Sequence, residues 1–349
     1  MGLAGTCFKV SFISGMNRRT MKKNHVFLLK LGLAFMMAFL TSRIGALLSD
    51  FSWGQDVLIM AMYLGLGLGN DFSILLKGFS NLRLYLLTQS SIFIIAPFVS
   101  MVFFKIAMLI TTDQSFIGLL FVGCLPTTIT SCIMLTQHSN GNTVGSVYNA
   151  MLAQLLAVVL SPFILSLMIS VEVNSVTSPL TVIYELAQRI LIPLFFGQIL
   201  RVLLPALFNR IGHRCEKISF NAIFIILYMN LSSLLQNSRS GLSVFSIAIS
   251  TLFAVLMFVL MVHLNWMLSG LARLPLPDRI SSAYTGTQKT LAMGVPLATI
   301  LFPHDAALVS QITIVIIGYY VSSLLFSVII IEGLIRSFRA RFESEMQKS

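Results

Sequence analysis

Two short polar segments, LPTTITSC at Leu125–Cys132 and TGTQKT at Thr285–Thr290, interrupt a chain that is otherwise almost continuously apolar. Each lies inside an apolar stretch long enough to cross a bilayer, and the two hold matching places in the two halves of the chain. A polar break in a membrane helix leaves backbone N–H and C=O groups that lipid cannot satisfy. Paired breaks of this kind are the best sequence indication of a transporter's substrate and ion site.

The composition indicates an all-α polytopic membrane protein. Apolar residues make up 56% of the 349 residues and charged residues only 10%, whereas soluble domains carry roughly 25% charge. Since a helix needs about 20 apolar residues to cross a bilayer, we predict ten spans, which leave no soluble catalytic domain. They lie near residues 27–49, 56–75, 84–109, 115–138, 143–170, 180–203, 218–238, 243–269, 280–302 and 307–335.

The net charge of +11 does not require a nucleic-acid partner. Ten spans bring both termini to one side, and placing them in the cytoplasm puts most basic residues there, including those of the two longest connections, Phe208–Lys217 and Gly270–Arg279. The opposite face keeps chiefly Arg43, Lys105 and Arg239, as the positive-inside rule expects. We predict a multi-pass protein of the cell (inner) membrane, with lipids as its surroundings.

Because each half has five spans, an odd number, the second half enters the membrane in the opposite orientation to the first. The sequence therefore predicts an inverted repeat, residues 27–170 and 180–335, an architecture used by secondary transporters. The fourth span carries the first break and the ninth span carries its counterpart. We expect one transporter domain over residues 26–336, with cytoplasmic tails at residues 1–25 and 337–349.

No motif indicates an enzyme or a resident cofactor. The four cysteines have no CxxC spacing, the histidines form no HExxH motif, and no serine lies in a GxSxG elbow. Gly65, Gly67 and Gly69 lack the spacing of a nucleotide-binding loop, and small residues on a membrane helix indicate close helix packing. We predict no cofactor, and the coupling ion, Na⁺ or H⁺, is left open. The oligomeric state is also left open.

The first break has the chemistry of an ion and anion site. Pro126 removes a backbone donor and clashes with the preceding turn, so the helix should end near Leu125. The freed carbonyls and a set of hydroxyls suit a hard cation, and the half-helix that follows presents its positive end to an anion. The hydroxyls belong to Thr127, Thr128, Thr130 and Ser131.

The second break repeats this chemistry with different residues. Gly286 would supply the unwound turn, and Thr285, Thr287 and Gln288 would supply oxygen donors. Two helix kinks repaired by threonines are the structural alternative, but their matched positions favour a functional site.

On these segments the chain resembles the bile acid:sodium symporter superfamily, and within it the branch of the seventh human solute carrier ten member and its bacterial homologues. The resemblance also rests on Asn140–Asn142, on Asn149, and on Gln89 eight residues before Pro97. It runs from about residue 27 to 335. It implies a core domain of spans 3–5 and 8–10, in which the two broken helices cross, and a panel domain of spans 1, 2, 6 and 7.

The resemblance also implies where sodium would bind. The positions of a first site are Ser131, Cys132, Ser146 and Asn149, with the cysteine standing where asparagine is usual and Asn149 one position from the family's threonine. Gln89 and Gln288 match two glutamines of a second site. Tyr284, however, replaces the glutamate that serves both sites, and Lys289 stands where the symporters have asparagine.

Lys289 is about nine residues into its span, roughly 14 Å deep at 1.5 Å per residue. Intramembrane lysines are costly and usually functional. Its ammonium could replace the bound sodium by bridging the carbonyl ends of the half-helices. It could instead couple transport to protons as a titratable group, neutralise an anionic substrate, or simply pack in a water-filled cavity.

We therefore expect a secondary transporter of a small or amphipathic organic anion that works by alternating access. Substrate contacts are expected from Thr127, Thr128 and Lys289, and from Asn230 on the panel side, where an interhelical hydrogen bond is the alternative. Sodium coupling stays open because Tyr284 and Lys289 alter the second cation site. The rival hypothesis is a non-transporting membrane regulator of calcium homeostasis.

Overall fold

A computed structural model describes residues 29–30, 32–50, 52–69, 81–110, 116–173, 184, 187–237, 244–302 and 305–346. Throughout these residues the chain is helical apart from short connections and contains no strand, which confirms the all-α prediction. Four helices are long and apolar enough to cross a membrane, at Leu82–Ile110, Thr143–Ile169, Ala248–Leu271 and Ala307–Ala340, and a bent pair makes up to five. The full set of ten spans and the inverted repeat stay predictions.

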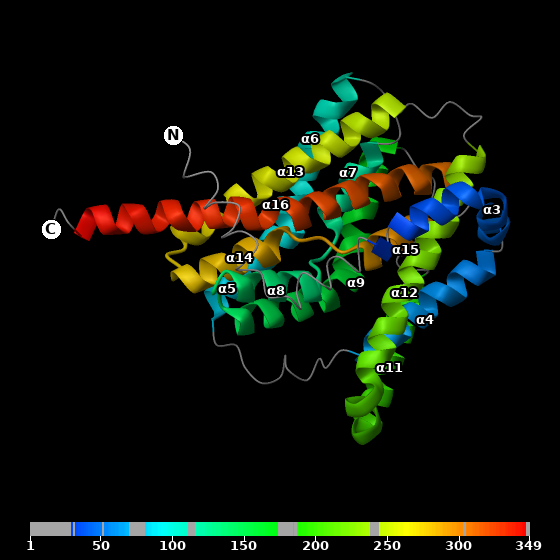
Figure 1. Ribbon diagram of the computed structural model, residues 1–349, viewed down its shortest axis with the longest axis horizontal. Helices are drawn as coiled ribbons and strands as arrows, with labels where there is room; N and C mark the ends of the chain where they lie inside the picture. Colours follow the sequence, from blue (N-terminus) through cyan, green and yellow to red (C-terminus); the bar gives the residue numbers. More distant parts are fainter. Residues whose placement is uncertain are drawn as a thin grey trace, which may run out of the picture.

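One group of helices lies along one side of the molecule (Figure 1). It consists of α3 (Ser42–Asp50), α4 (Ser52–Gly69), α11 (Ile192–Leu203) and α12 (Pro205–Asn237), which pack on one another. We call it the panel group.

Glycines allow α4 to approach its neighbours in the panel group closely. A Cβ atom added to Gly67 would overlap the Leu194 carbonyl oxygen, and one added to Gly65 would overlap the Ser219 hydroxyl. The predicted close packing of these glycines is confirmed.

A second group surrounds the two breaks, and we call it the core group. Its long helices are α5 (Leu82–Ser90), which continues through the π-helical η2 (Ser91–Ile95) into α6 (Ala96–Ile110), then α9 (Thr143–Val173), α13 (Val244–Leu271) and α16 (Ala306–Met346). Two broken pairs complete it: α7 (Ile117–Cys124) with α8 (Ile129–His138), and α14 (Leu276–Thr287) with α15 (Leu291–Leu301). The first pair is bent by 66° at its break.

The first break lies where Pro126 predicts it. Helix α7 ends at Cys124, and Leu125 is extended with φ −72° and ψ 145°, because a residue before proline avoids the helical region. Thr128, with φ −79° and ψ 130°, precedes the first turn of α8. Four residues are therefore unwound.

The second break differs from the prediction. Gly286 is not in the unwound turn but inside α14, and the unwound residues are Gln288, Lys289 and Thr290. The glycine serves packing instead, because a Cβ atom there would overlap the side-chain oxygen of Asn265 on α13. The expectation that Gly286 supplies the turn was wrong.

Two helices are longer than hydropathy predicts. The basic segment Phe208–Lys217, expected as a connection, lies inside α12, where Phe208 is buried while Arg210, Arg214 and Lys217 are exposed. Hydropathy averages over all faces of a helix, so an amphipathic turn is mistaken for a loop. Helix α16 likewise continues past residue 335 to Met346.

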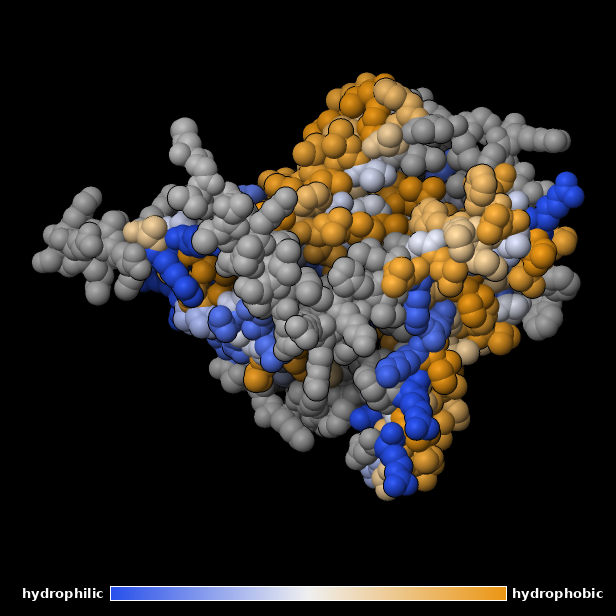
Figure 2. All heavy atoms as spheres, in the orientation of Figure 1, coloured by the Kyte–Doolittle hydropathy of each residue, from blue (hydrophilic) through white to orange (hydrophobic). Residues whose placement is uncertain are grey.

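Apolar side chains form much of the outer surface. They cover α6 and α13, whereas hydrophilic residues gather at one end of the α11–α12 pair (Figure 2). Phe98 and Leu109 on α6 are 70% and 87% exposed, and Phe245 on α13 is 66% exposed. Apolar areas this large are not left facing water in soluble monomers, so these faces are lipid-facing in a multi-pass membrane protein.

Candidate functional site at the helix crossing

The two breaks touch through their backbones. The N–H of Thr290 donates to the carbonyl oxygen of Pro126 over 3.0 Å. Both unwound segments are buried, with Thr127 fully enclosed and Thr290 only 5% exposed. The breaks therefore form a single crossing between α7–α8 and α14–α15.

Lys289 bridges the crossing from the second break to the first. Its Nζ donates to the carbonyl oxygens of Leu125, at 2.7 Å, and Gly123, at 3.2 Å. The side chain is 1% exposed. No carboxylate pairs with it anywhere in the part of the chain that the structure describes. Carbonyl dipoles at the C-terminal end of α7, which carries partial negative charge, therefore surround the ammonium.

The other carbonyls freed at the first break also have donors. The Ser161 hydroxyl donates to Cys124 O over 2.6 Å, and the Gln154 amide donates to Thr127 O over 2.6 Å. Together with Lys289 and the Thr290 N–H, these groups satisfy five consecutive carbonyls, from Gly123 to Thr127. An unpaired backbone group at this depth would be costly, so α9 and the second break stabilise the first.

Helix α16 satisfies the second break. The Tyr319 hydroxyl donates to Thr287 O over 2.8 Å. The Gln288 side chain donates to Ser323 O over 3.2 Å and accepts from the Ser323 hydroxyl over 3.0 Å. The Thr287 hydroxyl turns back to Ala283 O on its own helix, 2.6 Å away. The polar groups of this break are thus bonded within the protein.

A cavity of about 70 Å³ lies where the crossing faces the panel group. The first turns of α8 and α15 border it on the core side, and Tyr63, Leu66 and Leu194 border it on the panel side. Its polar lining residues are Thr128, Thr130, Ser131, Gln154, Thr290 and Tyr320. Among the described residues that line it, none is acidic.

Two predicted substrate residues, Thr127 and Thr128, are buried beside this cavity with unused hydroxyls. Within the described chain neither Oγ1 atom has a hydrogen-bond partner, and Thr128 precedes α8 without capping it. Thr290, by contrast, accepts from the Ala292 N–H over 3.2 Å and caps α15. Thr128 itself lines the cavity, and its hydroxyl is buried there without a partner among the described residues.

Of the residues expected at a first sodium site, Ser131 lines the cavity, whereas Ser146 and Asn149 lie in two hydrogen-bonded clusters. The Ser146 hydroxyl pairs with that of Thr285 at 2.8 Å and accepts from Thr136 at 3.2 Å, which joins α8, α9 and α14. The Cys132 thiol donates to Ile129 O over 3.4 Å on its own helix. Gln89 donates to both oxygens of Asn149, at 3.0 and 3.1 Å.

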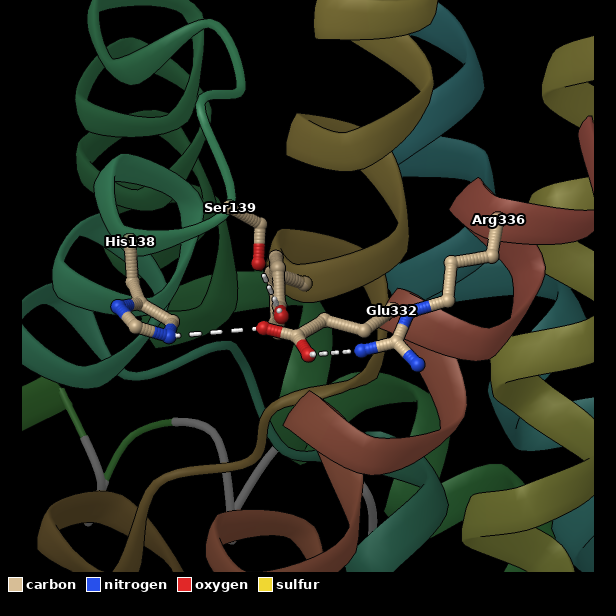
Figure 3. Close-up of polar contacts among 5 residues, drawn as sticks. His138, Ser139, Glu332 and Arg336 are labelled. Carbon is tan, nitrogen blue, oxygen red and sulfur yellow. Dashed lines mark hydrogen bonds and ion pairs between the residues drawn. The ribbon is translucent and has the colours of Figure 1, made fainter. Parts of the chain in front are cut away.

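The two glutamines expected at a second sodium site bond different helices. Gln89 bonds α9 through Asn149, whereas Gln288 bonds α16 through Ser323. Tyr284 turns its hydroxyl towards Ser139, 2.8 Å away, at the C-terminal end of α8. This end also carries an ionic cluster, in which His138 Nε2 lies 3.5 Å from Glu332 and Glu332 lies 3.9 Å from Arg336 (Figure 3). The cluster ties α8 to α16.

Asn230 is buried but does not line the cavity. Its backbone oxygen accepts from the Ser310 hydroxyl over 2.5 Å, and its Nδ2 has no partner within the described residues. The contact joins the panel helix α12 to α16. This interhelical bond is made by the backbone, so the role of the Asn230 side chain stays a prediction.

The Asn140–Asn142 motif has a structural role. Asn140 has a positive φ of 56° in the turn between α8 and α9, a conformation that asparagine tolerates. The Asn142 amide donates to Asp278 on α14 over 2.7 Å, and the Asn81 amide donates to the same carboxylate. Asp278 is 5% exposed. This carboxylate fastens α5, α9 and α14 together.

Sequence reasoning missed Gln154, Tyr319 and Ser323, which hold the breaks from α9 and α16. A glutamine in the middle of an apolar span was the available signal for Gln154, because lipid cannot satisfy its amide. Hydroxyls such as those of Tyr319 and Ser323 carry no comparable signal.

Comparison with known proteins identifies a family of transporters. The model of the SBF-like CPA transporter family matches residues 25–336. An uncharacterised protein of Pseudomonas aeruginosa is 24% identical over 257 residues, which cover 73% of this chain and 77% of the relative. Sodium/bile acid cotransporter 7 is 24% identical in Mus musculus over 79% of this chain and 81% of the relative, and 24% identical in Xenopus tropicalis over 79% and 80%.

Proposed function

Because this chain belongs to the SBF-like CPA transporter family, we propose that it carries a small organic anion across the membrane by alternating access, with the anionic group bound at the helix crossing. Relatives named sodium/bile acid cotransporters support an amphipathic carboxylate or sulfonate as the substrate class. We place the protein in the inner membrane with both termini in the cytoplasm, on the distribution of its basic residues.

The observation that carries the proposal is the convergence of two half-helix N-termini on one cavity. The same space is bordered at the start of α8 by Thr128, Ile129, Thr130 and Ser131, and at the start of α15 by Thr290, Ala292 and Met293. Helix N-termini carry partial positive charge and present free N–H groups, so they bind anions. Two such ends, an unused Thr128 hydroxyl and the lack of acidic lining among the described residues favour a negatively charged ligand.

The apolar part of the cavity favours an amphipathic substrate. Tyr63, Leu66 and Leu194 of the panel group and Val158 of α9 line it. An anionic group at the half-helix ends would leave the remainder of the molecule against these side chains. This division between polar and apolar walls is typical of small-molecule sites.

The size and place of the cavity support movement of the two groups. Its volume of about 70 Å³ is well below the roughly 300 Å³ at which sites for drug-sized ligands begin. It lies between the panel and core groups, which the Tyr63 hydroxyl joins by donating to Ala292 O over 3.3 Å. Admission of substrate therefore requires the groups to separate at this seam, as alternating access demands.

Uptake of radiolabelled taurocholate and benzoate into proteoliposomes tests the proposal, with Thr130→Asp as the informative variant. Thr130 lines the cavity in the first turn of α8, where a carboxylate suits the helix but repels an anionic substrate. We expect Thr130→Asp to lower uptake at least tenfold and Thr130→Asn, its neutral isostere, to retain most of it. Equal uptake by both variants would contradict an anion site here.

A wild-type protein that neither binds nor transports any anion in a broad panel would favour a non-transporting membrane regulator of calcium homeostasis.

A further inference from the structure

We propose that the Lys289 ammonium is a built-in cation that takes the place of a coupling ion at the helix crossing, so that transport by this protein does not depend on sodium. The inference rests on the proposed transport function and concerns how transport at the same site is coupled to an ion. The relatives, by contrast, are named as cotransporters of sodium and bile acid.

The first support is the position of the ammonium relative to the half-helices. Lys289 follows the last residue of α14, Thr287, by two positions, and its Nζ reaches the end of α7 at Leu125. Its charge therefore lies at the C-terminal, partially negative ends of two half-helices. In transporters with broken helices, such ends and the unwound carbonyls coordinate Na⁺ or H⁺. Here a covalently attached cation fills that role.

The second support is the pattern of carbonyl bonding. Of the five carbonyls from Gly123 to Thr127, neutral groups satisfy three, and the ammonium alone satisfies those of Gly123 and Leu125. The donor distances of 3.2 and 2.7 Å are those of ordinary hydrogen bonds. The two carbonyls that could otherwise coordinate a bound sodium ion already accept hydrogen bonds from the ammonium.

The third support is that several of the side-chain oxygens expected to hold sodium are hydrogen-bonded within the protein. Gln288 exchanges two hydrogen bonds with Ser323, and Thr285 pairs with Ser146. Gln89 Oε1 and the hydroxyls of Thr127 and Thr128 are exceptions, since they are buried with no partner in the described residues. A hard cation needs about six oxygen ligands, and one unused amide oxygen with two unused hydroxyls does not provide them. The donor set present does not fit sodium.

The charge of the ammonium has a further consequence. Lys289 lies in the same unwound segment as Thr290, which caps the helix facing the anion cavity. The segment thus carries a fixed positive charge on one side and the anion-binding helix end on the other. A covalently attached ammonium is not exchanged for sodium during the cycle, so a sodium gradient does not drive the substrate through this site.

The test measures sodium directly and needs no substrate. The full chain in nanodiscs is unfolded thermally in choline chloride, with NaCl or KCl replacing choline at constant ionic strength. We expect no sodium-specific shift for the wild type. Lys289→Asn should unfold at a lower temperature in choline, because two carbonyls lose their donor, and NaCl but not KCl should restore part of the loss in a saturable way.

Lys217→Asn is the matched control, because it makes the same change at an exposed position of α12 and should behave as the wild type. A saturable, sodium-specific rise for the wild type would overturn the inference. So would a Lys289→Asn variant that unfolds as the wild type does and ignores both salts. If Lys289→Asn does not fold, the same unfolding measurement is made on the wild type and on Lys289→Arg, which keeps the positive charge. A saturable, sodium-specific rise in either protein would then overturn the inference.

Transport assays separate this inference from the proposed function. Taurocholate uptake that an inward sodium gradient accelerates severalfold in the wild type would support transport and overturn the built-in cation. Sodium-independent uptake would support both. Failure of every anion to bind would contradict the transport proposal alone, because the unfolding measurements with sodium would still stand.

Discussion

Lys289 and Leu125, from opposite halves of the chain, are joined by a 2.7 Å hydrogen bond between the buried ammonium and the carbonyl oxygen. Pro126 frees that carbonyl, since it ends the preceding helix, and the second break brings the donor. Neither group could remain at this depth without the other, because lipid offers no partner. The bond therefore couples two breaks that the sequence shows only as separate interruptions.

Replacing Gln154 tests how far α9 supports the first break. Gln154→Leu removes the donor to Thr127 O while keeping a side chain of similar size. We expect a loss of about 1–3 kcal/mol in the free energy of unfolding, the cost of a buried unsatisfied carbonyl. Reversible unfolding of the reconstituted protein measures it.

Gln188→Leu is the matched control for that change. Gln188 bonds only the Tyr184 hydroxyl at an exposed position, so its loss should fall within about 0.5 kcal/mol. Equal effects of the two variants would contradict a role for Gln154 in holding the break.

Gly286→Ala should destabilise the contact between α14 and α13. The new Cβ atom would overlap the Asn265 side chain, and overpacking in a close-packed interior costs about 1–3 kcal/mol. Asn265→Ala should relieve the overlap, so the double variant should be more stable than the sum of the two single losses predicts. A double-mutant cycle on unfolding free energies makes the measurement.

Gly333→Ala serves as the control for the glycine change. No atom lies within 4 Å of a Cβ atom at Gly333 on α16, so alanine should stabilise the helix by about 0.5–1 kcal/mol. Destabilisation of similar size at both glycines would show that the loss at Gly286 is not steric.

Asp278→Asn should weaken the junction of α5, α9 and α14. Two amide donors, from Asn81 and Asn142, point at this 5% exposed carboxylate, and an asparagine would turn an N–H group towards one of them. The expected loss is about 2–3 kcal/mol, as for a buried charge-assisted bond left unsatisfied.

Asp305→Asn makes the same chemical change where an amide is acceptable. Asp305 accepts from the Leu308 N–H at the start of α16, and asparagine caps a helix about as well as aspartate. The unfolding free energy should change by less than about 0.5 kcal/mol. A loss at Asp305 that equals the loss at Asp278 would contradict the junction.

The ionic cluster of Figure 3 should contribute little to stability. Glu332 is 34% exposed and lies 3.5 Å from His138 and 3.9 Å from Arg336. Ion pairs of this kind contribute up to about 1 kcal/mol, and salt screens them. Glu332→Gln should therefore cost less than about 1 kcal/mol, and 0.5 M KCl should diminish the difference. A larger, salt-independent loss would mean that the cluster contributes substantially to holding α8 against α16.

Local chemistry explains what could be predicted at the breaks. Pro126 restricts its own backbone and that of Leu125, so the end of α7 follows from two adjacent residues. Gly286 carries no such restriction, because glycine permits either a turn or a close helix contact. Here it allows the close contact with Asn265 on α13. Prediction fails where the deciding atom is remote in sequence.

The amino-acid sequence alone establishes a helical membrane protein of this transporter family, the end of the first half-helix, and a lysine within the second polar segment. These follow from composition and from restrictions that act between neighbouring residues. The partners of Lys289, the different partners of Gln89 and Gln288, and the meeting of two helix N-termini at one cavity emerge only when the chain is folded. The physical reason is that each depends on bringing together groups from distant helices, whose hydrogen bonds and dipoles act only at short range.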